Sequence, residues 1–374
     1  MTISVTPVSG KRELNEFIHL PWSIYKMDET WVPPLKMAVK DLLNPNHPVY
    51  ETVDIQLFIA RDAQNRPIGR IAAIANKAHN DFWEDQIGFW GLFECINDQD
   101  VSTKLFATAE EWLKSKGFTS MRGPMNPSTN YECGLLVEGE EDPAQIMMTY
   151  NPQYYRSLIE QEGHIKSKDL LAYRIKTDFQ MPEKILSQAA NVEKANNISY
   201  RFVNKCQWDD EVERMLKIYN SAWEKNWGFV PMTENEFRHT AKELRQIIDE
   251  KLIMFVLVDG KEAGFIVCLP DFNQVFKQIP TGKLLPFGIL KILRAKKYIN
   301  RLRCITLGVL KEYRKLGLAS LMYTKMQQNA IELENYEEAE LSWILEDNIQ
   351  MNKPIELMGG EVYKRYRIYD KELS

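Results

Sequence analysis

The chain has 374 residues, of which 44% are hydrophobic and 26% charged, a composition typical of a folded protein long enough for two domains. Its formal net charge of −5 gives no general electrostatic reason to bind nucleic acid or an anionic membrane. No stretch reaches the roughly 18 apolar residues of a membrane span, so we expect a cytoplasmic protein with no nucleic-acid partner and no stable membrane insertion.

The cysteines and histidines do not form the patterns of a metal site. The five cysteines contain no CxxC pair, and the five histidines make no i, i+4 pair with each other or with a nearby cysteine. We therefore expect free thiols in a reducing compartment, and no metal.

The first half of the chain alternates strand and helix patterns. Its predicted strands are residues 3–8, 55–61, 68–76, 88–94 and 168–176, and its predicted helices are 11–27, 98–116 and 152–162. The polar, proline-rich run 122–134 is predicted to be an irregular loop, a kind of segment that often carries function.

The second half repeats the order of elements found in the first. After a polar bridging helix come predicted strands at 255–258, 263–269, 305–310, 340–345 and 361–369, and predicted helices at 315–333 and 350–358. Because the order in 55–176 recurs in 252–370, the sequence indicates an internal repeat of whole domains.

A glycine-containing motif lies where the strand at 305–310 leads into the following helix. Its residues are Arg314, Lys315, Leu316, Gly317, Leu318 and Ala319, which form the pattern Arg-x-x-Gly-x-Ala. The first N–H groups of a helix have no partner within the helix, and the helix dipole is positive there. Gly317 has no Cβ, so a diphosphate could approach the backbone closely.

This motif and the elements after it resemble the GCN5-related N-acetyltransferase (GNAT) superfamily, whose Gln/Arg-x-x-Gly-x-Gly/Ala loop binds the pyrophosphate of acyl-CoA. In the superfamily this loop and its helix are followed by a strand, an Asn, a short helix, a Gly and a final β pair. The same order occurs here, with a predicted strand at 340–345, Asn348, a predicted helix at 350–358, Gly359 and predicted β structure at 361–369. The resemblance implies an α/β (α+β) fold of two tandem GNAT-like domains, each a mixed, mostly antiparallel central sheet flanked by helices. The expected domains are 1–180, a bridging helix at 181–197, and 198–374.

The resemblance also implies the donor and the residues that bind it. The co-substrate would be acetyl-CoA or another acyl-CoA. Backbone groups of Leu307, Gly308 and Val309 would hold its pantetheine amides and thioester carbonyl. The six motif residues would hold its diphosphate. Asn348 matches the Asn of the superfamily's second motif, which follows the fifth strand.

The N-terminal copy departs from the donor-binding pattern. At the matching junction it has Asn97-Asp98-Gln99-Asp100-Val101, with no glycine and two acids that would repel a diphosphate. It keeps Asn151 and Tyr155 of the second motif. We expect a degenerate copy that closes the other cleft or presents the acceptor, and a C-terminal copy that binds acyl-CoA.

Direct transfer to an amine needs a base for the amine and an acid for the departing thiolate. Glu346, or its neighbour Asp347, is the predicted base, although the pair could instead cap the following helix. The tyrosine that often serves as the acid in the superfamily is replaced by Ile355, so Tyr363 is the predicted acid and Tyr366 an alternative.

The acceptor is expected beside the first helices of the C-terminal copy. Trp223 and Trp227 are four residues apart and would share a helix face, with Phe229 in the following turn. These three aromatic residues are the predicted acceptor-binding residues. An apolar helix face that packs into the core would explain the tryptophan pair equally well.

The sequence thus predicts an acyl-CoA-dependent N-acyltransferase, most simply an N-acetyltransferase, that acts on a small-molecule amine as a monomer or a homodimer. The alternatives are a non-catalytic CoA-binding or scaffold protein with this fold, and an enzyme that uses a long-chain acyl or aminoacyl donor. The basic amphipathic segment from Lys283 to Arg303 is either a solvated helix or a contact with a membrane or an acidic carrier.

Overall fold

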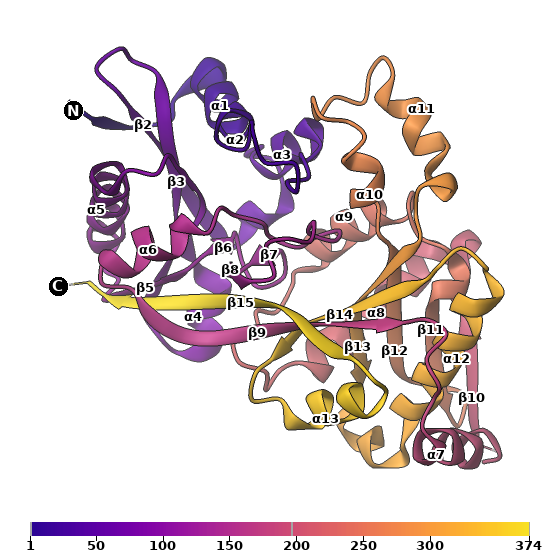
Figure 1. Ribbon diagram of the computed structural model, residues 1–374. Helices are drawn as coiled ribbons and strands as arrows, with labels where there is room; N and C mark the ends of the chain where they lie inside the picture. The colour runs from indigo at the N-terminus through magenta and orange to yellow at the C-terminus, as the bar shows by residue number, and fades with distance from the viewer. Residues whose placement is uncertain (1, 196, 374) are drawn as a thin grey trace. The chain divides into compact units, whose positions relative to one another are not determined.

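The computed structural model describes residues 2–195 and 197–373, and its contacts divide the chain into two compact units (Figure 1). Unit 1 contains Met1–Leu170, Phe276–Ile289 and Lys364–Ser374, and unit 2 contains Leu171–Val275 and Leu290–Tyr363. The boundary falls within the strands β9 and β15 and within the helices α10 and α11, so each unit takes part of all four. The domain limits expected at residues 180 and 198 stay a prediction.

The elements up to β9 begin with a short strand and end with a long one. They are β1 (Ser4–Pro7), α1 (Gly10–His19), α2 (Pro21–Ile24), α3 (Lys36–Leu42), η1 (Pro48–Glu51), β2 (Val53–Arg61), β3 (Pro67–Asn76), α4 (Lys77–Trp83), β4 (Ile87–Cys95), α5 (Gln99–Ser115), β5 (Ser120–Gly123), β6 (Met125–Asn126), β7 (Glu132–Cys133), β8 (Leu135–Glu138), α6 (Tyr154–Gln161) and β9 (Ile165–Lys176).

The elements after β9 begin with the bridging helix. They are α7 (Glu183–Glu193), β10 (Ile198–Phe202), η2 (Lys205–Gln207), α8 (Trp208–Ala222), α9 (Glu234–Leu244), η3 (Glu250–Leu252), β11 (Ile253–Val258), β12 (Lys261–Pro270), α10 (Asn273–Phe276), α11 (Gly288–Leu293), η4 (Ala295–Lys297), β13 (Arg301–Val309), η5 (Lys311–Leu316), α12 (Leu318–Glu332), β14 (Glu338–Leu345), α13 (Ile349–Leu357) and β15 (Glu361–Glu372).

Unit 1 is built on a sheet with the strand order β1-β2-β3-β4-β5-β15. Neighbouring strands are antiparallel except β4 and β5, which are parallel. Helix α5 packs against the sheet because Val101, Leu105 and Ala109 recur every four residues and are fully buried in its core.

Unit 2 repeats this plan with the order β10-β11-β12-β13-β14-β9, in which β13 and β14 are the parallel pair. Helix α12 packs on one face, where Leu321 and Met322 meet the buried side chains of β11 and β12. Residue Trp223, at the end of α8, contacts Phe265 on the opposite face. The predicted fold class, with mixed, mostly antiparallel sheets flanked by helices, is confirmed, and so is the predicted repeat of elements.

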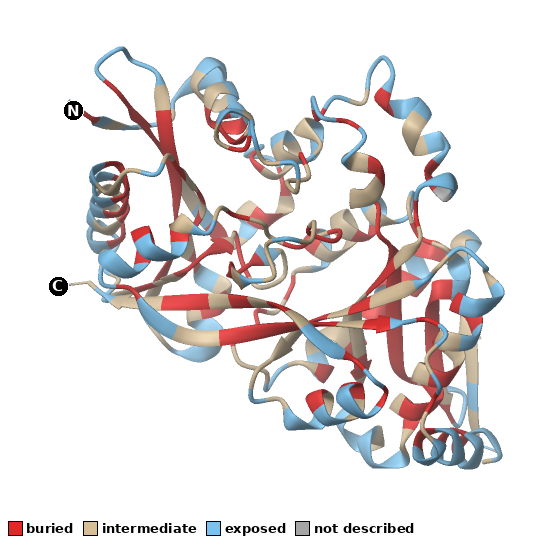
Figure 2. Cartoon of the chain, in the orientation of Figure 1, coloured by how far each residue is buried: buried red, intermediate tan, exposed pale blue. Residues whose placement is uncertain are grey.

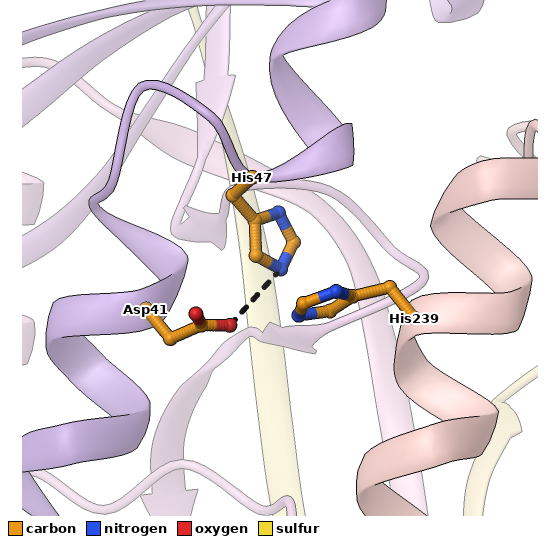
Figure 3. A group of neighbouring side chains, drawn as sticks. All are labelled: Asp41, His47 and His239. Atoms are coloured by element: carbon orange, nitrogen blue, oxygen red, sulfur yellow. Dashed lines mark ion pairs between the residues drawn. The ribbon is translucent and has the colours of Figure 1, made fainter.

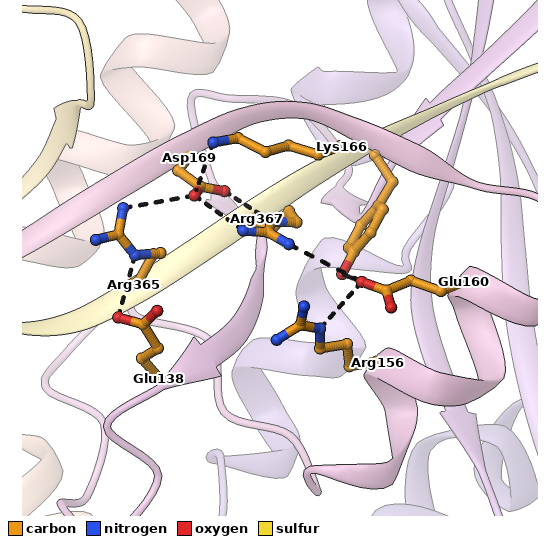
Figure 4. A network of polar contacts seen from close by, with 8 residues as sticks. Glu138, Arg156, Glu160, Lys166, Asp169, Arg365 and Arg367 are labelled. Carbon is orange, nitrogen blue, oxygen red and sulfur yellow. Dashed lines mark hydrogen bonds and ion pairs between the residues drawn. The ribbon is translucent and has the colours of Figure 1, made fainter.

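A buried carboxylate joins β9 to β15 within unit 1 (Figure 4). Asp169 on β9 accepts hydrogen bonds from Arg367 Nε at 2.8 Å and pairs with Lys166 Nζ at 3.0 Å. Burial would raise the pKa of Asp169, but the bonds from Arg367 and Lys166 outweigh it and hold the pKa below its usual value. The last strand of the chain is thereby fixed in the first unit's sheet.

Among the described residues, no helix combines the length and the apolar character that a membrane span requires.

We predict that His164 makes unit 1 sensitive to acid. Its ring is buried against Trp90 and Phe106, at centroid distances of 5.4 and 4.6 Å, and burial lowers its pKa to about 3. The unfolded chain takes up a proton near pH 6.5 and the folded chain does not, so the free energy of unfolding falls as the pH drops below about 6.5. The loss reaches about 2 kcal/mol at pH 5.

Urea unfolding at pH 7 and pH 5 measures this effect, with His164→Phe as the comparison. The variant should lose less stability between the two pH values than the unsubstituted protein does. Equal losses in the two proteins would show that His164 is not the source.

Candidate active site

The two parallel strands of unit 2 separate partway along their length. Their paired residues run from Arg301 opposite Glu338 to Cys304 opposite Leu341, and both strands then continue for four or more residues beyond the last pair. On its other side β13 stays paired with β12 up to Val309 opposite Gly264. One edge of β13 is therefore released from pairing between Ile305 and Val309, at the position predicted to hold the donor.

Backbone N–H groups of this released edge face the gap. The amide of Leu310 donates to the carbonyl of Ala263 at 2.9 Å, and N–H directions alternate along a strand. The amides of Leu307 and Val309 therefore face away from β12, toward the separated β14. The amide of Gly308, which was predicted to bind donor with them, faces β12.

Gly308 instead provides room for a tryptophan ring. A Cβ on this residue would lie 2.1 Å from Cη2 of Trp223, so no other residue type fits beneath the ring. The register between β12 and β13 shifts at a different place, between Val267 and Cys268. The close approach at Gly308 is thus that of the protein's own side chain.

The predicted diphosphate loop follows β13. Residues Lys311–Leu316 form a 3₁₀ turn, and Gly317 has φ +75° at the start of α12. This left-handed conformation favours glycine because a Cβ would clash with the backbone. The N-terminus of α12 carries the unpaired amides and the positive dipole end that a diphosphate needs.

A side chain that sequence reasoning missed lies against this loop. Gln188 on α7 accepts a hydrogen bond from Ser320 Oγ at 2.8 Å, and its amide nitrogen lies 2.4 Å from where a Cβ of Gly317 would be. The amide is an N–H donor beside the first turn of α12. No signal near the motif could have found it, because α7 precedes the motif by more than a hundred residues.

The arginine of the motif donates hydrogen bonds to backbone carbonyls of the protein. Arg314 donates to the carbonyl of Val309 at 3.1 Å and to that of Ala222, the last residue of α8, at 2.6 Å. It thereby ties the end of α8 to the end of β13. Lys315 and Leu316 complete the 3₁₀ turn, and Leu318 and Ala319 form the first turn of α12.

A buried polar cluster lies where β13 and β14 begin to separate. Glu340 is fully buried, and Arg303 and Ser342 are 3% and 4% exposed. Arg303 Nε donates to Ser342 Oγ at 3.0 Å and lies 3.4 Å from Glu340 Oε1, and Ser342 Oγ donates to the same carboxylate oxygen at 2.6 Å. Tyr363 on β15 donates its hydroxyl to the other carboxylate oxygen, Glu340 Oε2.

This cluster combines a carboxylate and a partly exposed tyrosine beside the released edge of β13. Only Tyr363 was predicted from the sequence. Sequence reasoning missed Glu340 because it stands at the start of the predicted strand 340–345, where a charged residue is also expected at an exposed strand end. Removing Arg303 would leave the Glu340 carboxylate buried without its cation, which costs about 3–5 kcal/mol in such pairs.

Three other residues named in the sequence analysis, including the predicted base Glu346, have structural contacts, and their predicted roles stay predictions. Asn348 is the N-cap of α13, where its side chain accepts from Met351 N at 3.3 Å. Glu346 lies at the end of β14, and its carbonyl accepts from Asn352 at 3.2 Å. Ile355 is fully buried in the core of unit 2.

The aromatic residues predicted for the acceptor lie around the end of α8. Tyr219 contacts both Trp223 and Phe229, at centroid distances of 5.1 and 6.1 Å. The prediction that Trp223 and Trp227 share a helix face is wrong, because α8 ends at Ala222 and Trp227 lies in the loop beyond it. The partly exposed Trp223 remains placed over β13.

The corresponding gap in unit 1 is filled by the protein's own residues. The paired residues of β4 and β5 end at Phe89 opposite Arg122. Beyond them, Leu92 N donates to Asn126 Oδ1 at 2.7 Å, and Cys95 N donates to the Tyr155 hydroxyl at 2.9 Å. The loop 122–134 and α6 therefore bind the amides that a donor would need in this copy.

Other parts of unit 1 support this interpretation. Asp98 caps α5 by accepting from Asp100 N at 2.9 Å, which puts a carboxylate where unit 2 has Gly317. The Tyr155 hydroxyl donates to Glu94 at 2.7 Å, and burial raises the pKa of that carboxyl. These groups form a closed interior cluster.

A histidine and an aspartate that meet in unit 1 also form a structural contact (Figure 3). His47 is buried, and its Nε2 lies 4.0 Å from Asp41 Oδ2. Its Nδ1 accepts from Val49 N at 3.2 Å, so the proton of the neutral ring is on Nε2, toward the carboxylate. The pair links α3 to η1.

Comparisons with solved structures agree with this fold. A tandem GNAT protein from the clavulanic acid biosynthesis pathway has a TM-score of 0.61 at 10% identity, and the match covers 100% of this chain and 99% of that one. A GCN5-related N-acetyltransferase from Sphaerobacter thermophilus has a TM-score of 0.53 at 12% identity over 99% and 96% of the two chains. The predicted tandem GNAT fold is confirmed.

Comparisons with known sequences define the family. The bacterial ceramide synthase of Caulobacter vibrioides is 36% identical over 379 residues, covering 99% of this chain and 98% of that protein. Protein YghO of Escherichia coli is 33% identical over 370 residues, covering 97% and 94%. No protein-family model matches the sequence. The chain belongs to the family that contains these two proteins.

We predict that Gln188→Glu weakens the binding of CoA by tenfold or more. The substitution puts a carboxylate beside Gly317, where it would repel the diphosphate. Isothermal titration with CoA measures the effect. Ser187→Glu is the matched control, since it adds the same charge to an exposed neighbouring position on α7. Equal affinities in the two variants would contradict diphosphate binding at this loop.

Proposed function

We propose that this chain transfers a long-chain acyl group from acyl-CoA to the primary amine of a long-chain amino alcohol, giving an amide of the ceramide type. The observation that carries the proposal is the 36% identity to the bacterial ceramide synthase over nearly the full length of both proteins. The GNAT fold itself supports only the coarser statement, an acyl-CoA donor and a small-molecule acceptor.

The donor site of the proposal is the gap between β13 and β14. The amides of Leu307 and Val309 would hold the pantetheine chain, and the first turn of α12 with Gln188 would hold the diphosphate. The thioester would then lie where the strands begin to separate, beside the buried cluster. Amides fixed in a strand can stabilise the negative charge that develops on the thioester oxygen, because they need no reorganisation during the reaction.

Tyr363 and Glu340 would move the proton. As the amine nitrogen attacks the thioester carbon, its proton passes to the Tyr363 oxygen while the tyrosine proton passes to Glu340. Collapse of the tetrahedral intermediate breaks the carbon–sulfur bond, and the same path returns one proton to the thiolate. The products are an amide and CoA thiol, with no net change in the protein. Arg303 and Ser342 would act as positioning residues that orient the carboxylate.

The aromatic residues at the end of α8 fit an apolar acceptor. Trp223 lies directly over β13 at Gly308 and is partly exposed, so it could border both the acyl chain and the amine. Phe229 and Tyr219 extend the aromatic surface behind it. These contacts support an amine with a hydrocarbon chain over a small polar one.

Release of CoA thiol, followed with a thiol reagent, tests the proposal. We predict turnover with a long-chain acyl-CoA and a long-chain amino alcohol such as sphinganine, and much slower turnover with acetyl-CoA or with a short polar amine. Tight donor binding without thiol release in the presence of any long-chain amine would favour the non-catalytic alternative and contradict the proposal.

We predict that Tyr363→Phe lowers kcat by about 10²–10⁴-fold, the usual contribution of a general acid–base group, with little effect on donor affinity. The substitution removes only the hydroxyl and leaves the Arg303–Glu340 pair intact. Glu338→Gln is the matched control, because Glu338 lies two residues before Glu340 in the paired part of β14. If the control lost as much kcat as Tyr363→Phe, the assignment of the proton path would be wrong.

A further inference from the structure

A contiguous segment between β12 and β13 exposes large apolar side chains. It runs from Lys283 to Lys297, includes α11, and is called the basic apolar segment here. Leu285, Phe287 and Leu293 are 76%, 73% and 76% exposed. Figure 2 shows exposed residues along α11. Side chains of this size are usually buried, so their exposure together indicates a surface that is covered in use.

The same segment carries concentrated positive charge. The chain has 52 acidic residues, yet no Asp or Glu lies between Asp271 and Glu312. The segment contains the cations Lys283, Lys291, Arg294 and Lys297. In the part of the chain that the structure describes, Lys283, Arg294 and Lys297 are in no ion pair. The overall charge of −5 therefore conceals a local basic surface.

The turn directly before the segment is held by hydrogen bonds within unit 1. Trp22 Nε1 donates to the carbonyl of Pro280 at 2.8 Å, and Lys36 N donates to that of Gly282 at 2.9 Å. The Lys36 ammonium lies 4.2 Å from the centre of the Trp22 ring. Burial lowers the pKa of Lys36, and so do the nearby charges of Lys283 and Lys40. The exposed apolar residues thus follow an anchored turn with additional lysines nearby.

We infer that the basic apolar segment docks the protein on the surface of an anionic lipid bilayer. Leu285, Phe287 and Leu293 enter the boundary between headgroups and acyl chains, and the cations contact lipid phosphates. Alternation of large apolar and basic residues is the pattern of interfacial membrane segments. A symmetric contact with a second copy would bring the basic surfaces together and is disfavoured. An acidic protein partner would pair the cations without giving the three apolar side chains a matching environment.

This inference stands on exposure and charge and holds whatever acyl chain the enzyme uses. If the proposed function is correct, docking also gives the active site access to an amphiphilic amine dissolved in the membrane.

Co-sedimentation with vesicles tests the inference without any substrate, so its outcome is independent of the proposed activity. The probes are vesicles of phosphatidylcholine alone and vesicles that also contain phosphatidylglycerol. We expect the protein to sediment with the anionic vesicles and much less with the neutral ones. Phe287→Ser/Leu293→Ser and Lys283→Glu/Arg294→Glu should each lower the partition coefficient by about tenfold or more, because the first removes buried apolar groups and the second removes cations near the lipid phosphates.

Two controls separate this surface from nonspecific effects. Ile165→Ser changes an apolar residue outside the segment that is 69% exposed. Lys11→Glu/Lys114→Glu makes the same charge change as Lys283→Glu/Arg294→Glu, at exposed sites outside the segment. Both should bind like the unsubstituted protein, and thermal unfolding should show that all variants are folded. The inference is overturned if the unsubstituted protein does not sediment, or if segment and control variants bind alike. Retention on immobilised polyglutamate without vesicle binding would assign the segment to an acidic protein instead.

Discussion

The proposed active site depends on the incomplete pairing of two parallel strands. β13 and β14 pair from Arg301 to Cys304 and then separate, while β12 keeps β13 in place on the other side. A strand with one free edge presents backbone amides that are fixed in direction before any ligand arrives, which is the arrangement that stabilises a developing oxyanion at least cost. The cluster of Arg303, Glu340, Ser342 and Tyr363 lies at the point of separation, so the proposed acid–base chemistry and the proposed amide binding would meet in one place.

The duplicated fold shows how the protein's own residues can fill the gap between two separating parallel strands. In unit 1 the parallel strands β4 and β5 also separate, but Asn126 and Tyr155 accept hydrogen bonds from the released amides, and Asp98 caps the following helix. Such internal bonds satisfy buried polar groups that would otherwise cost stability. The proline-rich loop 122–134, whose composition drew attention as a functional loop, fills the gap with a two-residue ladder and polar side chains. In this copy the polar loop stabilises the fold.

Much of the fold could be predicted from the sequence, because hydrophobic periodicity and turn residues act locally. The hairpins, the helices α5 and α12, and the repeat of elements all follow such patterns. The site was harder to predict, because its parts come together only in three dimensions. Gln188 reaches Gly317 from a distant helix, and Glu340 is recognisable only once Arg303 and Tyr363 lie beside it. The helix end at Ala222 was missed because Arg314, ninety-two positions later, binds its carbonyl. Net charge likewise concealed the acid-free stretch that contains the basic apolar segment.

The central claim is that one acyl-CoA binds per chain, in the gap between β13 and β14. A crystal structure with a non-hydrolysable thioether analogue of a long-chain acyl-CoA tests it most directly. The account predicts the diphosphate at the first turn of α12 beside Gln188, the pantetheine along Leu307 and Val309, and the thioether sulfur near Tyr363. Analogue bound between β4 and β5, or with its diphosphate away from Gly317, would contradict the account.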